Sequence, residues 1–354
     1  MEQKFSGSLH IFHAFDVGED IDLERIREKQ LLVRQPVPSS KYFKNYHKPL
    51  AVELPHPHQT SHCKVVRLHP FGVISLHYQI PFESSFERLA RNIGDTDNNF
   101  REQSVADAAM IYKAIEPVTK KPTFFHIARS YLVIQIDTTP ELNGQQLQEQ
   151  YGVEIASLLR FEDKSLSEYK KNEILERAFG YFRGDLIVID TEASFIYDDE
   201  YEELLDLFEF VNVQQLELQY FDRVLDEQLT QAYNVGSKKK LSLREYIPRG
   251  RANLSREDNL AMLKVEISVI TERLENSIKL AGEPYYTELY EALSRALGLN
   301  DWKTSIGKKL SIVQDLSEIY EHRAQAARDD LINILIVILI FLELIVGIVQ
   351  YLHL

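Results

Sequence analysis

The chain contains the stretch Leu331-Ile-Asn-Ile-Leu-Ile-Val-Ile-Leu-Ile-Phe-Leu-Glu-Leu-Ile-Val-Gly-Ile-Val-Gln350, which has no Lys or Arg and one acidic residue, Glu343. Its length matches the roughly 20 helical residues that cross the hydrocarbon core of a bilayer. A helix satisfies its own backbone hydrogen bonds in lipid. The sequence therefore predicts one transmembrane helix over residues 331–351, with a buried core helix of a soluble protein as the alternative.

The residues that flank this stretch predict its orientation. His322, Arg323 and Arg328 precede it, and only His353 follows it. Cationic residues near a span stay on the cytoplasmic side of the membrane. We therefore expect a tail-anchored protein with its N-terminal bulk in the cytoplasm. The first ten residues show no secretory signal and no Arg-rich transit peptide, which favours a bacterial inner membrane over a mitochondrial one.

Composition limits the classes of protein and partner. A chain of 354 residues with 44% apolar content has room for two domains besides the span. A single cysteine, Cys63, excludes an internal disulfide and fits a reducing compartment. The net charge of −14 argues against sequence-independent binding of nucleic acid over the whole surface.

Residues 1–198 mix period-two apolar runs with short helical stretches, which predicts an α+β head domain. Five proline residues fall within residues 35–62, where we expect an extended loop or small insertion. The predicted strands are Leu9–Val17, Lys64–Leu68, Val73–Ile80, Phe124–Asp137 and Asp185–Ile196. The predicted helices are Leu23–Gln30, Phe86–Asn92, Ser104–Ile115, Gln145–Leu159 and Glu168–Phe182.

The sequence pattern of residues 199–330 predicts long antiparallel coiled-coil helices, which form a helical neck. Three stripes of mostly apolar residues recur at alternating spacings of three and four, as in a coiled-coil seam. The first stripe is Leu204, Phe208, Val211, Gln215, Leu218, Asp222, Leu225, Leu229 and Ala232. The second is Leu260, Leu263, Ile267, Ile270, Leu274 and Ile278. The third is Ile306, Leu310, Val313, Ser317, Tyr320, Ala324 and Ala327, and it runs into Leu331 without a helix breaker. The stripes fit either a bundle within one chain or a coiled coil between chains.

A family resemblance rests on two segments. The segment Phe208-Glu-Phe-Val-Asn-Val-Gln-Gln-Leu-Glu-Leu-Gln-Tyr-Phe-Asp-Arg-Val-Leu-Asp226, with two further helices and an apolar helix after it, resembles the "required for meiotic nuclear division" or sporulation family of proteins of unknown function. Phe71-Gly-Val-Ile-Ser75 is similar to that family's glycine-led strand. The resemblance covers residues 65–354. It implies a location on a membrane and a link to organellar translation, and it supplies no catalytic residue.

A proline-rich loop carries the candidate metal ligands His56, His58, His62 and Cys63. Imidazole and thiolate groups are preferred ligands of zinc, although this spacing matches no standard zinc signature. A solvated loop with scattered histidines is the alternative. We expect no bound cofactor.

The basic link, residues 236–253, joins the first two long helices. Its cationic residues are Lys238, Lys239, Lys240, Arg244, Arg249 and Arg251. Such a cluster suits anionic lipid headgroups or RNA phosphates, and a solvated loop is the alternative. The link lies at the bilayer end if the second helix runs antiparallel to the membrane-entering helix. It faces the cytoplasm if residues 285–297 form a complete extra antiparallel helix, because the direction of the chain is then reversed.

Two acidic features need an explanation. Residues 198–203 and Asp206 place negative charge at the start of the first long helix, where it complements the helix dipole or holds a divalent ion. Glu343 lies near the middle of the predicted span, where an ionised side chain costs about 2 to 3 kcal/mol. We therefore predict that Glu343 meets its counterpart from another chain and that the protein is a homo-oligomer.

Motifs of common enzymes are missing, including a P-loop, a Gly-x-Ser-x-Gly elbow and a His-Glu-x-x-His pair. We therefore expect a membrane-tethered, non-enzymatic scaffold that positions a cytoplasmic protein partner. The first alternative is an oligomeric ion- or solute-handling assembly that uses Glu343. The second is a metal-dependent enzyme in the head domain.

Overall fold

The computed structural model describes residues 3–36, 48–56, 61–162, 166–180, 184–238, 264–265, 267–269, 272 and 284–352. The chain divides into two compact units. The first comprises Met1–Tyr220 and Glu272–Trp302, and the second comprises Phe221–Thr271 and Lys303–Leu354. The predicted mixed domain of strands and helices is confirmed in the first unit, where it includes the beginning of the first long helix.

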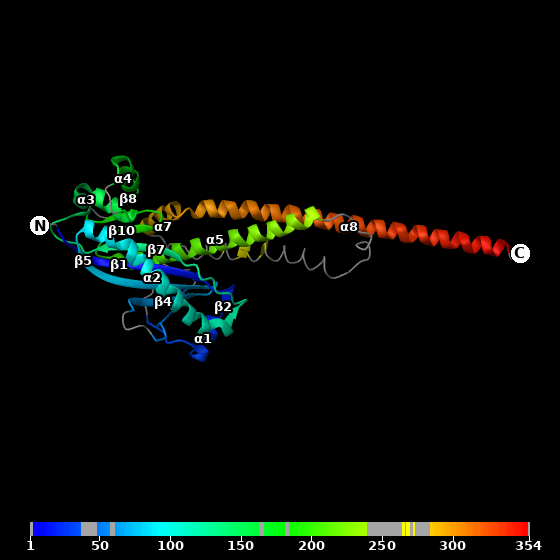
Figure 1. Ribbon diagram of the computed structural model, residues 1–354, viewed down its shortest axis with the longest axis horizontal. Coiled ribbons are helices and arrows are strands. Elements are labelled where there is room, and N and C mark those ends of the chain that lie inside the picture. Colours follow the sequence, from blue (N-terminus) through cyan, green and yellow to red (C-terminus); the bar gives the residue numbers. More distant parts are fainter. Residues whose placement is uncertain are drawn as a thin grey trace. The chain divides into compact units, whose positions relative to one another are not determined.

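An eight-stranded sheet forms the centre of the first unit, in the order β3-β4-β5-β1-β7-β10-β9-β8 (Figure 1). Neighbouring strands are antiparallel except β7 and β10, which are parallel. The strands are β1 Phe5–Asp16, β3 Leu50–Val52, β4 Cys63–His69, β5 Val73–Ser84, β7 Arg129–Ile136, β8 Ala178–Phe179, β9 Leu186–Ile189 and β10 Ala193–Tyr197. The short strands β2 Asp20–Ile21 and β6 Thr119–Lys120 pair separately.

The helices begin at clear local signals. Ser85 accepts a hydrogen bond from the Arg88 amide at the start of α2, and Asn143 forms a capping box with Gln146 at the start of α3. The helices are α1 Leu23–Lys29, α2 Phe86–Ile115, η1 Glu116–Val118, α3 Gly144–Leu159, α4 Glu168–Leu175, α5 Tyr201–Lys238, α7 Pro284–Ala296 and α8 Leu299–Leu352.

The two faces of the sheet differ in what covers them. Along β1, Leu9, Ile11 and Phe15 point into an apolar core that also contains Phe86 and Ile111 of α2. The alternate residues point to the opposite face, as the period of two in a strand requires. There Phe12 pairs with Tyr131 of β7, whose ring stacks on Phe208 of α5 with centroids 6.0 Å apart. The first half of α5 therefore covers the second face.

Gly72 makes the turn between β4 and β5, within the segment that resembles the glycine-led strand of the family named above. Its φ of +96° is a conformation that side chains with a Cβ atom rarely adopt. A Cβ atom at this position would also lie 1.8 Å from the carbonyl oxygen of Gly18. The turn therefore requires glycine, and β5 begins at the next residue.

Three local predictions are wrong. The break between Phe86–Asn92 and Ser104–Ile115 does not occur, because α2 is continuous and the Thr96 hydroxyl and the Asp97 carboxylate are bonded within the helix. The predicted strand Asp185–Ile196 is a hairpin of β9 and β10, with a turn at residues 190–192. The predicted helix Glu168–Phe182 ends at Leu175 and is followed by β8.

The first predicted seam packs differently from the expectation. Leu204, Phe208, Val211 and Leu218 are buried as predicted. However, α5 lies on the sheet over this half of the seam, because its aromatic and polar side chains contact β4 and β7. The coiled-coil pairing of the neck stays a prediction, and most of the second stripe lies outside the described residues.

The second unit contains the rest of α5 and nearly all of α8. The Lys309 ammonium lies 2.7 Å from carboxylate oxygens of Asp222 and Asp226 on α5. Ile306 and Val313, two members of the third stripe, are buried. Helix α8 then continues without a break to Leu352, which confirms that one helix runs into the apolar stretch.

Candidate functional site

Two arginines lie in one row across the sheet, on the face that α5 covers. The strand register places Arg67 beside Ser75, Ser75 beside Ala14 and Ala14 beside Arg129. Side chains in such a row point to the same face, because each strand presents alternate residues to alternate sides. Both ends of the row therefore present a guanidinium group to α5.

Arg67 pairs with two acids that stand three residues apart on α5. Its Nη2 atom lies 2.7 Å from Oδ1 of Asp206, and its Nη1 atom donates to Glu209. The Arg67 side chain is 12% exposed and that of Glu209 only 2%. A buried pair of this kind is costly to break, because removal of one partner leaves an uncompensated charge in the interior.

The other end of the row holds α5 through amides. Nε of Arg129 donates to Oε1 of Gln215 at 2.6 Å, and Nε2 of Gln215 donates to the Leu297 carbonyl at 2.9 Å. The Asn212 amide donates to the Arg129 carbonyl at 3.1 Å. Together with Arg67, these bonds clamp the first half of α5 to the sheet.

A buried histidine pair lies on the same face. Nδ1 of His10 and Nε2 of His77 are 2.9 Å apart, and both rings are almost fully buried. Burial first, and the charge of Lys64 second, lower the pKa of His10 to about 3. Burial also lowers the pKa of His77 well below its ordinary value. The pair is therefore neutral at physiological pH and is a poor general base.

A buried acid lies farther along α5. Burial first, and the charge of Asp16 second, raise the pKa of Glu217 well above its ordinary range. Asp16, at the end of β1, accepts a hydrogen bond from the Gly18 amide at 3.0 Å. Two nearby buried carboxyl groups cannot both ionise cheaply, which is why the pKa of Glu217 is shifted upward.

The α2 face also contains a polar cluster. The Tyr78 hydroxyl donates to Asp107 at 2.6 Å, and the Ser130 hydroxyl donates to Asp97 at 3.0 Å. The ring of His13 lies 5.9 Å from that of Tyr78, and burial, partly opposed by Asp97, lowers its pKa to about 4. The Tyr78–Asp107 and Ser130–Asp97 pairs are hydrogen-bonded within the core, whereas neither ring nitrogen of His13 has a hydrogen-bond partner among the described residues.

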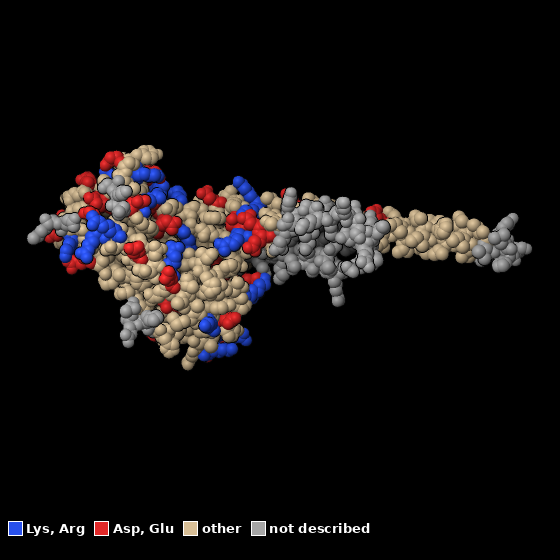
Figure 2. Space-filling view, in the orientation of Figure 1, with Lys and Arg blue, Asp and Glu red and all other residues tan. Residues whose placement is uncertain are grey.

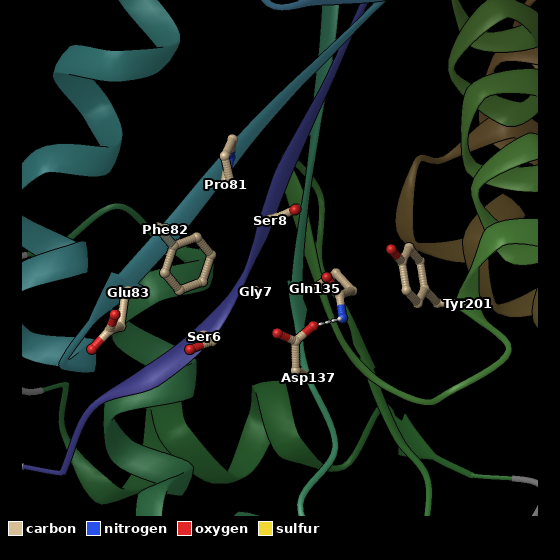
Figure 3. A pocket seen from close by; sticks show the side chains of 9 residues that line it. All are labelled: Ser6, Gly7, Ser8, Pro81, Phe82, Glu83, Gln135, Asp137 and Tyr201. Carbon is tan, nitrogen blue, oxygen red and sulfur yellow. Dashed lines mark hydrogen bonds between the residues drawn. The ribbon is translucent and has the colours of Figure 1, made fainter.

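A depression of about 490 Å³ opens at the other end of β1 (Figure 3). Ser8, Gln135, Asp137 and Tyr201 line one side of it, and Nε2 of Gln135 donates to Asp137 at 3.1 Å. Gly7 also lines the depression, and a Cβ atom at this position would lie 2.0 Å from the Gln135 carbonyl oxygen. The depression is open, and its lining residues include neither a histidine nor a cysteine.

The proposed metal ligands are only partly described. Burial raises the pKa of the Cys63 thiol to about 12, which disfavours the thiolate that binds zinc. The thiol donates weakly to the Val65 carbonyl at 3.8 Å. His58 lies outside the described residues, and the described ones contain no group of three or more metal-binding side chains. The metal site stays a prediction.

The basic link is also outside the described residues, which hold only Lys238 of its six cations, as the last residue of α5. Residues Pro284–Ala296 form the separate helix α7. The side on which the basic link lies stays a prediction. At the start of α5, Asp206 pairs with Arg67 in place of the divalent ion considered for it.

The apolar end of α8 is long and apolar enough to cross a membrane. Residues Asp329–Ile348 form this stretch, and none of its window is buried. Figure 2 shows it as tan surface on the face in view. Glu343 is exposed, and it makes no hydrogen bond or ion pair with the residues that the structure describes. The predicted apolar helix is therefore confirmed.

Sequence reasoning missed the arginine row and the histidine pair. One half of the signal for the pair was visible, because His10 stands within the largely apolar run Leu9–Phe15. The row depends on strand register, which joins Arg67 to Arg129 across four strands and cannot be read from either local segment.

The comparisons with known proteins identify the sheet domain. The chain is 28% identical over 207 residues to uncharacterized protein MJ0711 of Methanocaldococcus jannaschii, over 55% of this chain and 59% of that protein. No solved structure matches the chain. The resemblance to the meiotic nuclear division family stays a prediction. Residues 6–203 match the family described as uncharacterized protein MJ0711, N-terminal domain. The chain therefore belongs to the MJ0711 N-terminal domain family.

Proposed function

We propose that this protein is a membrane-tethered scaffold: α8 crosses a bilayer once and holds the sheet domain at the membrane, where that domain positions a protein partner. The observation that carries the proposal is the apolar stretch Asp329–Ile348, of which no part is buried. Large apolar side chains exposed in a continuous block mark a surface that something other than water covers.

The alternatives for an apolar helix do not fit this stretch. A core helix of a soluble protein is mostly buried, whereas Val337 is 65% and Phe341 63% exposed. A secretory signal lies near the beginning of a protein, whereas 328 residues precede Asp329. A bilayer covers all sides of such a helix equally, which matches exposure on every side of it.

The flanks of the stretch support a cytoplasmic sheet domain. Arg323 and Arg328 lie within one to two helical turns before it, and cations near a span favour the cytoplasmic side. The basic link adds cations on the same side of the span, where anionic lipid or RNA phosphates are candidate ligands. The cytoplasmic location of the sheet domain and the binding of phosphate groups by the basic link both extend the proposal. Both depend on the same orientation of the span in the membrane.

A scaffold role for the sheet domain is favoured over catalysis by the chemistry of its polar groups. The buried histidines His10 and His77 are neutral and weakly basic, and the depression at Gly7 lacks a hydrogen-bonded nucleophile and base. Arg67 is neutralised by Asp206 and Glu209 of α5, and Arg129 pairs with Glu192. These groups hold the domain together, and its outer surface is left for a partner.

Charge insertion into the span tests the proposal. In the double variant Ile338→Arg/Leu342→Arg, each Arg costs about 2.5 to 3.5 kcal/mol at the centre of a spanning helix. We expect the full chain to resist carbonate extraction from membranes and the double variant to be extracted. Ile312→Arg is the matched control, because Ile312 is a similarly exposed isoleucine of α8 outside the span. Extraction of the unaltered chain, or retention of the double variant, would overturn the proposal.

An ion-handling assembly is the second candidate, and Glu343 is the observation that favours it. A carboxylate inside a membrane marks many ion and proton paths. Proteoliposomes that contain the full chain would then show a cation flux that Glu343→Gln abolishes. Equal flux with empty vesicles would leave the scaffold as the better account.

A further inference from the structure

We propose that a second copy of this chain packs in parallel along one face of α8, with Glu343 of each copy in the contact. This inference rests on the proposed function, because the membrane supplies the common orientation of the two copies. The partner is a second α8 helix, which would cover a face that the residues described in one chain leave exposed.

The face is marked inside the apolar stretch. Between residues 331 and 348, only three residues are not large and apolar: Asn333, Glu343 and Gly347. At 100° per residue, steps of ten and four place all three within an arc of about 80°. Counting by threes and fours from Asn333 gives Ile336, Ile340, Glu343 and Gly347, which is the spacing of a helix-pairing seam.

The same face continues outside the membrane. Steps of seven back from Asn333 reach Ala326, Ile319 and Ile312, and all three are exposed in the single chain. Ile319 is 46% and Ile312 48% exposed, although both are isoleucines in an aqueous part of the helix. The side of α8 that carries Ile306 and Val313 is already buried, so this row is a different face.

The chemistry of the row suits a copy of itself. Two copies anchored by the same span have the same direction, so equivalent residues meet across a two-fold axis. An Asn in such a seam pairs with its counterpart and fixes the register, and Gly347 lets two backbones approach closely. Two Glu343 carboxyl groups that face each other can hydrogen-bond across the seam, which gives each a polar partner inside the membrane.

Cysteine crosslinking in membranes tests the face. In a Cys63→Ser background of the full chain, Asn333→Cys reports on the proposed face and Ile338→Cys on the opposite one, five residues or about 140° away. We expect roughly fivefold more disulfide-linked dimer from Asn333→Cys, because equivalent residues of a two-fold seam lie close together. Equal yields at the two positions would overturn the proposal.

The mass of the protein in dodecyl maltoside tests the role of Glu343. We expect a dimer for the unaltered chain and for Glu343→Gln, whose amide still bonds across the seam, and a monomer for Glu343→Leu. A monomeric unaltered chain, or a dimer for Glu343→Leu, would overturn this role. Carbonate extraction of membranes that contain the same variants separates the proposed membrane anchoring from the proposed pairing of α8 helices. A chain that is washed off defeats both, whereas a retained chain without face preference defeats only the second.

Discussion

The first half of α5 and the apolar end of α8 differ in whether their polar side chains have partners within the chain. The α5 segment carries Glu209, Asn212 and Gln215 in the interior, and the sheet domain supplies a partner for each. The α8 segment carries Asn333 and Glu343 on an exposed surface, and the described residues supply no partner for either. The difference shows where each helix finds its surroundings: α5 within its own chain, and α8 outside it.

The two helices also show why apolar content alone does not predict whether a helix is buried in its own chain. Both helices contain stripes of apolar residues at helical spacing, yet Phe208 is fully buried and Phe341 is 63% exposed. Around Phe208, apolar residues alternate with the acids Asp206 and Glu209, which pair with Arg67 of the sheet. Around Phe341, apolar residues surround the helix on all sides, which is the composition that lipid selects.

The largest expected effect on stability comes from removing the cation that pairs with Glu209, which leaves Glu209 without an ion pair, as Glu343 is. Arg67→Ala leaves Glu209 buried without its cation and Asp206 without its bond, which costs about 3 to 5 kcal/mol. Hydrogen exchange of the β4 and β5 amides in the full chain should accelerate accordingly.

Two further variants serve as controls for Arg67→Ala. Arg91→Ala removes an exposed ion pair with Glu87 and should change the exchange by less than about 1 kcal/mol. Glu343→Gln should leave exchange in the sheet unchanged, because its effects lie in the second unit. An Arg67→Ala protein as stable as Arg91→Ala would show that the arginine row does not hold α5.

Sequence patterns predicted those helices and strands whose hydrophobic spacing can be read within the element itself. The long strands β1, β4 and β5, helix α3 and the apolar end of α8 follow from period-two or helical spacing over their own lengths. In each case, the residues that decide the structure are close together in the chain.

The clamp on α5 could not be predicted in the same way. Arg67 is 139 residues before Asp206, and only the register of β4, β5, β1 and β7 brings it under the helix. The acid block at the start of α5 looked like a helix cap or an ion site, because its cation lies in a distant strand. Burial of Asp206 and Glu209 is likewise a property of the sheet, and their own segment does not reveal it.

A smaller effect is expected at the amide end of the clamp. Gln215→Ala removes the bonds to Arg129 and to the Leu297 carbonyl, and it leaves buried polar groups unpaired at a cost of about 1 to 3 kcal/mol. Urea unfolding of the full chain in detergent, followed by circular dichroism, measures this loss. Gln314→Ala, at an exposed glutamine of α8, is the control and should cost less than about 0.5 kcal/mol. Equal losses would place the importance of Gln215 in its helix propensity, outside the clamp.

The last predicted effect is a dependence on pH that arises in the sheet domain and is small over a single pH unit. His69 is fully buried at the end of β4, and burial lowers its pKa to about 3. The unfolded chain binds a proton at His69 below about pH 6.5, whereas the folded chain does so only near pH 3. The stability that neutral His69 contributes is therefore complete above pH 6.5 and is lost as the pH falls toward 3, by about 1.4 kcal/mol per pH unit. His69→Leu should flatten the fall in unfolding free energy between pH 6 and pH 4 by about that slope. An unchanged slope would mean that His69 gains a proton in the folded sheet domain, and that the core around β4 admits charge as readily as water does.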